Sequence, residues 1–132
     1  MELSKIRAAG KAILEGQWVD VPQIPGVRFL VRGASHPEVR RYGAKMFSAL
    51  PREMREDPEE MEKIERAQAR DAILLNWEGL QDGGAALACT AETKATAFAD
   101  PELAVVFTEA VSAASAKVGK IEAEAEKADA KN

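Results

Sequence analysis

The spacing of apolar positions predicts that most of this chain is helical. Between residues 35 and 50, apolar side chains recur at the period of one helix face, and they are Val39, Tyr42, Met46, Phe47 and Leu50. Ser35 and Glu38 match a capping box at the start of this helix, and Pro51 marks its end. A weaker apolar pattern over residues 3–14, interrupted by Gly10, predicts a short first helix.

Two further helix starts have an aspartate followed by a proline. Asp57-Pro58 predicts a helix whose opening turns are charged and whose end, residues 72–77, is apolar nearly all round and must therefore be buried. After a Gly-rich turn at residues 82–84, residues 90–99 predict a short helix around Phe98. Asp100-Pro101 then starts the last helix, whose narrow apolar stripe is close to heptad spacing.

Residues 17–32 have a different pattern, which predicts a β-hairpin. Gln17–Val21 and Val27–Arg32 are rich in aromatic and β-branched residues, and the segment between them contains two prolines and a glycine. Val27, Phe29 and Val31 would share one face, and Leu30 would lie on the other. Because two strands alone are marginal in water, we expect the hairpin to pack on the helices.

The predicted fold is therefore mainly α, with one small domain and a tail. Residues 1–121 form a single α-rich domain that includes the hairpin at about residues 17–32. Residues 122–132 alternate alanine with charged residues and contain no large apolar side chain, which predicts a charged tail that is helical or disordered.

Length and composition limit this domain to a modest core. The chain has 132 residues, of which 46% are hydrophobic, and 25 of these hydrophobic residues are alanines. A chain of this length forms one domain, which excludes multidomain enzymes. Because few of its apolar side chains are large, burial against a partner would add usefully to its stability.

Charge and cysteine content narrow the class of partner and the compartment. The net charge of −4 argues against a nucleic-acid surface. Residues 1–56 carry 10 basic and 6 acidic side chains, whereas residues 57–132 carry 8 and 16. This polarity suits head-to-tail self-association or a basic partner for the C-terminal half, and it equally fits solvated helix faces of differing composition. The single cysteine, Cys89, points to a reducing cytoplasm. Without an apolar run long enough for a membrane span or a signal peptide, we expect no membrane partner and a cytoplasmic location.

The sequence offers few groups for catalysis, so we expect that the protein is not an enzyme and has no cofactor or metal. His36, the only histidine, precedes a proline at a helix start and favours a surface or capping role. Cys89 lacks a setting that would activate its thiol. The carboxylates at positions 57–65 alternate with Lys63 and Arg66, as on a solvated helix face. A small metal-dependent enzyme that uses this acidic turn remains an alternative.

Apolar side chains that exceed the needs of a small core favour a protein that binds other proteins. Singly, each of these residues also fits a core, but together they suggest an accessible helix stripe and one position on the hairpin. The candidate partner-binding residues are Leu103, Val106, Phe107, Val111 and Val118 of the last helix and Leu30 of the hairpin. On this interpretation, aspartate at position 107 or 111 would weaken partner binding while the protein stayed helical.

The order of these segments resembles that of the tail assembly chaperones of long-tailed bacteriophages and prophages. The resemblance extends to about Ile121, and its strongest piece is Trp77-Glu78-Gly79 with an Asp-Gly turn downstream. The segments that carry it are Trp18–Val21, Gly26–Arg32, the Ser-x-Pro-Glu helix start at Ser35, Asp71–Leu80 and Phe98–Leu103. The chain departs from the family pattern at residues 85–90, where it lacks the usual proline and aromatic residue.

The resemblance implies a protein that acts in the bacterial host cytoplasm and is absent from the mature virion. Such a protein binds the long tape-measure protein, keeps it soluble and helps to recruit tail-tube protein while the tail is built. A head-to-tail adaptor or a minor tail protein of the virion is the alternative within the same machinery.

Overall fold

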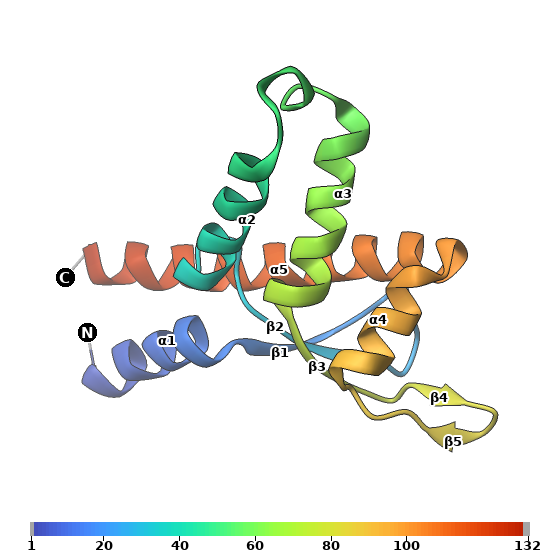
Figure 1. Ribbon diagram of the computed structural model, residues 1–132. Coiled ribbons are helices and arrows are strands. Elements are labelled where there is room, and N and C mark those ends of the chain that lie inside the picture. Colours follow the sequence, from blue (N-terminus) through green and yellow to red (C-terminus); the bar gives the residue numbers. More distant parts are fainter. Residues whose placement is uncertain (1, 131–132) are drawn as a thin grey trace.

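The computed structural model describes the backbone of residues 2–130 and the side chains of residues 2–118 (Figure 1). The elements, in chain order, are α1 (Leu3–Glu15), β1 (Gln17–Asp20), β2 (Arg28–Val31), α2 (Pro37–Ala49), η1 (Arg52–Met54), α3 (Pro58–Gln68), η2 (Ala69–Ile73), β3 (Leu74–Glu78), β4 (Gln81–Asp82), β5 (Ala85–Ala86), α4 (Ala91–Ala99) and α5 (Pro101–Ala130). The prediction of a mainly α-helical fold with a β-hairpin is confirmed.

A three-stranded antiparallel sheet forms the base of the molecule, in the order β1-β2-β3. β1 and β2 form the predicted hairpin, in which Val19 lies opposite Phe29. On the other side of β2, Phe29 lies opposite Trp77, and an irregularity at Leu30/Val31 leaves Leu75 as an extra residue in β3. As predicted, Phe29 and Val31 are buried on one face of the sheet while Arg28 on the other face is exposed.

The core lies between this inner sheet face and α5. α5 contacts β1 and β2 and presents to them a run of small and aromatic residues. Phe29 and Phe107 stack with ring centroids 5.9 Å apart, and Val111, Ala114 and Val118 continue the buried face of α5. The Oγ of Ser115 donates to the carbonyl oxygen of Arg32 (3.0 Å), which ties α5 to the chain just beyond β2.

The remaining helices pack around α5 in two ways. α1 lies alongside α5, and α4 packs on it near its start (Figure 1). α2 and α3 instead project together away from α5 as a helical hairpin, which we call the α2–α3 arm (residues 37–68). The arm begins at His36, whose Nδ1 accepts from the backbone N–H of Glu38 (3.1 Å), so His36 and not Ser35 is the N-cap of α2.

The prediction that the helix from residue 58 extends to Trp77 is wrong. α3 ends at Gln68, one π-helical turn follows, and residues 74–78 form β3. The expectation that this apolar run is buried is confirmed for Leu74 and Trp77. A short apolar run fits a buried helix end or a buried strand equally well, and pairing with β2 decides in favour of the strand.

The other predicted starts match the structure. Asp57 caps α3 by accepting from the N–H of Glu59 (2.9 Å), and Thr90 caps α4 in a reciprocal box with Thr93. α5 starts at Pro101 and continues as one helix to Ala130, so the backbone of the predicted tail is helical through that residue. The side chains of the tail and residues 131–132 lie outside the part of the chain that the structure describes.

Candidate partner-binding surface

Three of the predicted partner-binding residues belong to the core. Phe107 is only 6% exposed, and Val111 and Val118 are fully buried. The ring of Phe107 lies 5.9 Å from those of Phe29 and Trp77 and 5.7 Å from that of Phe98. The prediction of an accessible stripe is therefore wrong for these three side chains, because the inner sheet face already covers the heptad-like face of α5.

The other predicted residues of α5 lie at the edge of that buried face. Leu103 is 46% exposed and Val106 is 40% exposed, and the three-residue spacing places them one turn apart on the same side of the helix. Together they leave apolar surface accessible at the start of an otherwise well-packed helix.

Leu103 belongs to an apolar groove between α4, the start of α5 and the β4–β5 hairpin, which we call the α4–α5 groove. It has a volume of about 480 Å³. Its apolar lining consists of Leu80, Leu87, Ala97, Leu103 and the edge of Phe107. The polar side chains along it are those of Gln81, Asp82, Glu92, Thr93 and Thr96. A largely apolar lining beside polar groups is typical of a site that binds an amphipathic segment.

Hydrogen bonds hold the wall of this groove in place. The indole Nε1 of Trp77 donates to the carbonyl oxygen of Leu87 (2.8 Å). The backbone N–H of Leu87 donates in turn to the carbonyl oxygen of Leu80 (2.9 Å). The hydroxyl of Thr93 donates to the carbonyl oxygen of Ala88 (2.7 Å), which connects the segment to α4. Residues 85–90 are thus anchored from both sides, and the groove is preformed.

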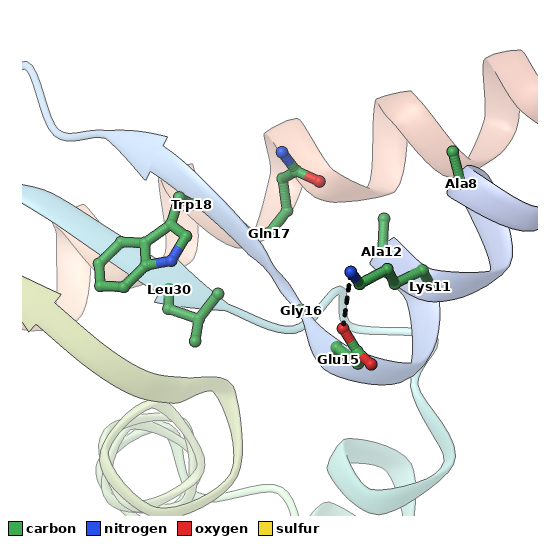
Figure 2. Close-up of a pocket in the computed structure, with 8 residues that line it drawn as sticks. All are labelled: Ala8, Lys11, Ala12, Glu15, Gly16, Gln17, Trp18 and Leu30. Carbon is green, nitrogen blue, oxygen red and sulfur yellow. Dashed lines mark ion pairs between the residues drawn. The ribbon is translucent and has the colours of Figure 1, made fainter. Parts of the chain in front are cut away.

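The sixth predicted residue, Leu30, lies on the outer face of the sheet beside Trp18 (Figure 2). Both side chains are partly exposed and line a cleft of about 470 Å³, which continues to the end of α1 at Lys11 and Glu15. The guanidinium of Arg28 lies 5.3 Å from the centre of the Trp18 ring and donates to Glu78 (2.7 Å). This face is a second, smaller apolar surface, and the structure does not bring Leu30 together with Leu103 and Val106.

A glycine makes the junction beside this cleft possible. Gly16 links α1 to β1 with φ +84°, a conformation that other residues rarely adopt. A Cβ at this position would lie 2.9 Å from the carbonyl oxygen of Val31. Gly16 therefore allows the end of α1 to approach the sheet.

The most developed polar cluster lies where α2 meets η2. The hydroxyl of Tyr42 donates to Asp71 (2.6 Å), and Arg70 donates to both carboxylate oxygens of Asp71 (2.7 and 2.8 Å). The bonds from Arg70, with that from Tyr42, lower the pKa of Asp71. Burial, together with the bond to Asp71, raises the pKa of Tyr42. Asp71 is thus ionised and occupied by its partners at neutral pH, which suits a structural link between the arm and the rest of the fold.

Two of the candidates for catalysis, His36 and Cys89, do not line the α4–α5 groove or the cleft beside Leu30. The carboxylates of Glu59, Glu62 and Glu65 lie on the exposed face of α3. The buried His36 ring caps α2. Burial raises the pKa of the Cys89 thiol, which leaves it protonated at neutral pH. Within the described residues, no group of three histidine, cysteine, aspartate or glutamate side chains is placed to hold a metal ion. The helices described there also lack the combination of length and apolar character that a bilayer span requires.

The sequence interpretation missed the residues that build the far wall of the α4–α5 groove. Leu80 and Leu87 flank the Gly83-Gly84 turn, and this arrangement of apolar residues around a glycine pair is a recognisable hairpin signal. The contact between Leu87 and Trp77 joins segments that only the folded chain brings together.

Comparison of the chain with protein-family models, with curated proteins and with solved structures finds no match.

Proposed function

We propose that this protein is a tail assembly chaperone of a long-tailed bacteriophage or prophage. In the bacterial host cytoplasm it would bind the tape-measure protein, keep it soluble and help to recruit tail-tube protein, and it would be absent from the mature virion. It would act by binding alone, without cofactor or metal and without making or breaking bonds.

The α4–α5 groove is the observation that supports this proposal best. The segments that carry the resemblance to the chaperone family, Asp71–Leu80 and Phe98–Leu103, supply Leu80 on one side of the groove and Leu103 on the other. Trp77, in the first of these segments, anchors the wall through its bond to the carbonyl oxygen of Leu87. The order of motifs in the sequence and the apolar surface of the fold thus coincide at one place. A preformed groove also spares a partner the cost of ordering its binding site.

The groove suits a helix with a narrow apolar stripe. Such a helix would place two or three side chains against Leu80, Leu87 and Leu103, and Val106 would extend the contact along α5. One groove of this size gives a weak contact. A long partner with repeated stripes would bind many copies, so that avidity replaces a single tight interface.

Co-expression with the tape-measure protein encoded in the same genome tests the proposal. We expect that the wild-type chain keeps the tape-measure protein soluble, and that Leu103→Asp reduces the soluble complex about tenfold, because a buried charge opposes an apolar contact. Val105→Asp is the matched control, since Val105 is 60% exposed on the same helix but does not line the α4–α5 groove. Equal capture by the wild type and Leu103→Asp would exclude this groove, and no capture by the wild type would refute the function.

The alternative is a head-to-tail adaptor or a minor tail protein, which would also be small, helical and rich in binding surface. Mass spectrometry of purified virions separates the two. A chaperone is present in infected cells and missing from virions, whereas an adaptor or minor tail protein is found in both.

A further inference from the structure

The α4–α5 groove combines an apolar lining with acidic side chains along its edge. Asp82 of the β4–β5 hairpin and Glu92 in the first turn of α4 both line the groove, and both are exposed. Glu102 is exposed in the first turn of α5, next in sequence to the lining residue Leu103. Each of the three elements that bound the groove therefore carries a carboxylate in it or next to a residue that lines it.

Cations of the same segments do not balance these carboxylates. Residues 80–107, the span from which the groove is built, contain four acidic residues and one basic residue, Lys94. The ammonium of Lys94 donates to the carbonyl oxygen of Leu74 (2.9 Å), and Lys94 does not line the groove. Among the described side chains, the ion pairs involve neither Asp82 nor Glu92. Both carboxylates are therefore available to a cation of another molecule.

The apolar lining decides what kind of cation fits. A metal ion would make no use of Leu80, Leu87 and Leu103, and no group of three possible metal ligands is assembled in the described part of the chain. A helix with an apolar stripe and basic residues beside it would use both parts of the groove. The long stems of lysine and arginine can lie on apolar surface while their charged ends reach the edge.

We propose that the α4–α5 groove selects basic amphipathic helices, in which lysine or arginine flanks the apolar stripe. The stripe would lie on Leu80, Leu87 and Leu103, and the flanking cations would meet Asp82 and Glu92. That this helix belongs to the tape-measure protein rests on the function proposed above, whereas the charge preference does not. The preference would supply specificity, because apolar contact alone accepts any helix with a suitable stripe.

Two designed helical peptides test the preference with the purified full chain. They share one leucine stripe and differ only in the residues that flank it, which are lysines in one peptide and glutamates in the other. By fluorescence anisotropy at low salt, we expect the lysine peptide to bind about tenfold more tightly, because the glutamate peptide turns two attractive pairs into repulsive ones. Salt at about 1 M should reduce this ratio, since it screens exposed charges.

Charge variants assign the preference to the groove. Asp82→Lys/Glu92→Lys should reverse the order of the two peptides, and the milder Asp82→Asn/Glu92→Gln should make their affinities nearly equal. Glu59→Lys/Glu62→Lys is the matched control, because it changes the net charge by the same amount on the exposed face of α3, away from the lining of the groove. This control should keep the wild-type order. Circular dichroism establishes that each variant is folded.

Several outcomes would overturn the proposal. These are equal affinity of the wild type for both peptides, tighter binding of the glutamate peptide, binding of neither, or an order that Asp82→Lys/Glu92→Lys leaves unchanged. The neutral change Leu103→Ser should weaken both peptides, and unchanged binding would place the peptides elsewhere and count equally against it.

Failure of this proposal and failure of the proposed function give different results. A wild type that prefers the lysine peptide but does not keep the tape-measure protein soluble would retain the charge preference and refute the chaperone function. Capture of the tape-measure protein that depends on Leu103 but is the same for Asp82→Lys/Glu92→Lys as for the wild type would do the reverse.

Discussion

Different kinds of interaction stabilise the α2–α3 arm and the rest of the fold. The sheet, α4 and the described part of α5 bury a continuous core around Phe29, Trp77, Phe98 and Phe107. In the arm, only Val39 of α2 is buried, and α3 has no buried residue at all. Burial of apolar surface is the main source of stability. The part of the chain outside the arm, which we call the body, therefore supplies most of the stability, and the arm is attached to it.

Local and polar contacts hold the arm instead. The side-chain amide of Gln68 at the end of α3 donates to the carbonyl oxygen of Val39 in α2 (3.0 Å). Arg55 donates to the carbonyl oxygen of Leu50 (3.2 Å), and its guanidinium lies 5.4 Å from the centre of the Phe47 ring. Two large apolar side chains of the arm, Phe47 and Met54, remain exposed, so burial of apolar surface contributes little to the stability of the arm.

The largest expected difference in stability is between alanine variants at two phenylalanines, one in the body and one in the arm. Phe107→Ala should lower the free energy of unfolding by about 3–5 kcal/mol, because it removes the centre of the aromatic cluster. Phe47→Ala in the arm should cost less than about 1 kcal/mol, since Phe47 is 41% exposed. Urea denaturation of both variants, followed by circular dichroism, measures the difference.

Similar losses of unfolding free energy for the two variants would mean that arm and body form one cooperative core, contrary to the difference between them described above.

The burial of Phe107 and Val111 also changes the outcome expected for aspartate substitutions in the α5 stripe. Aspartate at Phe107 or Val111 would bury a charge in the core, so we now expect unfolding, and not a folded protein with weaker partner binding.

A smaller effect is expected from the link between the two arm helices. Gln68→Ala should cost about 1 kcal/mol, the usual worth of one hydrogen bond, and should act on the arm alone. By hydrogen exchange, amides of α2 and α3 should exchange faster than in the wild type, while those of α5 residues 104–118 should keep their rates. Gln17→Ala, a change at a partly exposed site on β1, is the control and should leave the arm unchanged. Equal acceleration in α5 would show that the arm does not open on its own.

Much of the fold was predictable because its signals are local. The Asp57-Pro58 and Asp100-Pro101 starts, the Thr90 region and the hairpin at residues 17–32 each depend on a few neighbouring residues, and the structure contains all four. β3 was not predictable in this way, because residues 74–78 become a strand only by pairing with a segment more than forty residues earlier. Helix propensity and apolar spacing carry no information about that partner.

The candidate site was predictable only in part for the same reason. Leu103 and Val106 were correctly placed at an accessible position, whereas Phe107, Val111 and Val118 share their stripe and are buried. A heptad-like pattern gives the direction in which apolar side chains point, but not whether a sheet of the same chain or a separate helix covers them. The wall at Leu80 and Leu87 required the tertiary contact with Trp77.

The smallest expected effect concerns the polar link between arm and body. Bonds from Arg70 and Tyr42 hold the pKa of Asp71 below its usual value, so the stability it contributes is present above about pH 4 and is lost as the pH falls further. The pKa of Tyr42 is raised by burial and by its bond to Asp71, so its contribution is complete below about pH 10 and is lost as the pH rises through the folded value. Because these side chains are partly exposed, each effect should stay below about 1 kcal/mol.

Melting temperatures between pH 3 and 11 for the wild type, Asp71→Asn and Tyr42→Phe measure these contributions. Asp71→Asn should flatten the acid side of the profile, and Tyr42→Phe should flatten the alkaline side. Glu56→Gln, which removes an exposed carboxylate of the arm, should change neither. If the Asp71 and Tyr42 variants kept the wild-type profile, the cluster would contribute nothing to the attachment of the arm, and packing around Val39 would have to account for it alone.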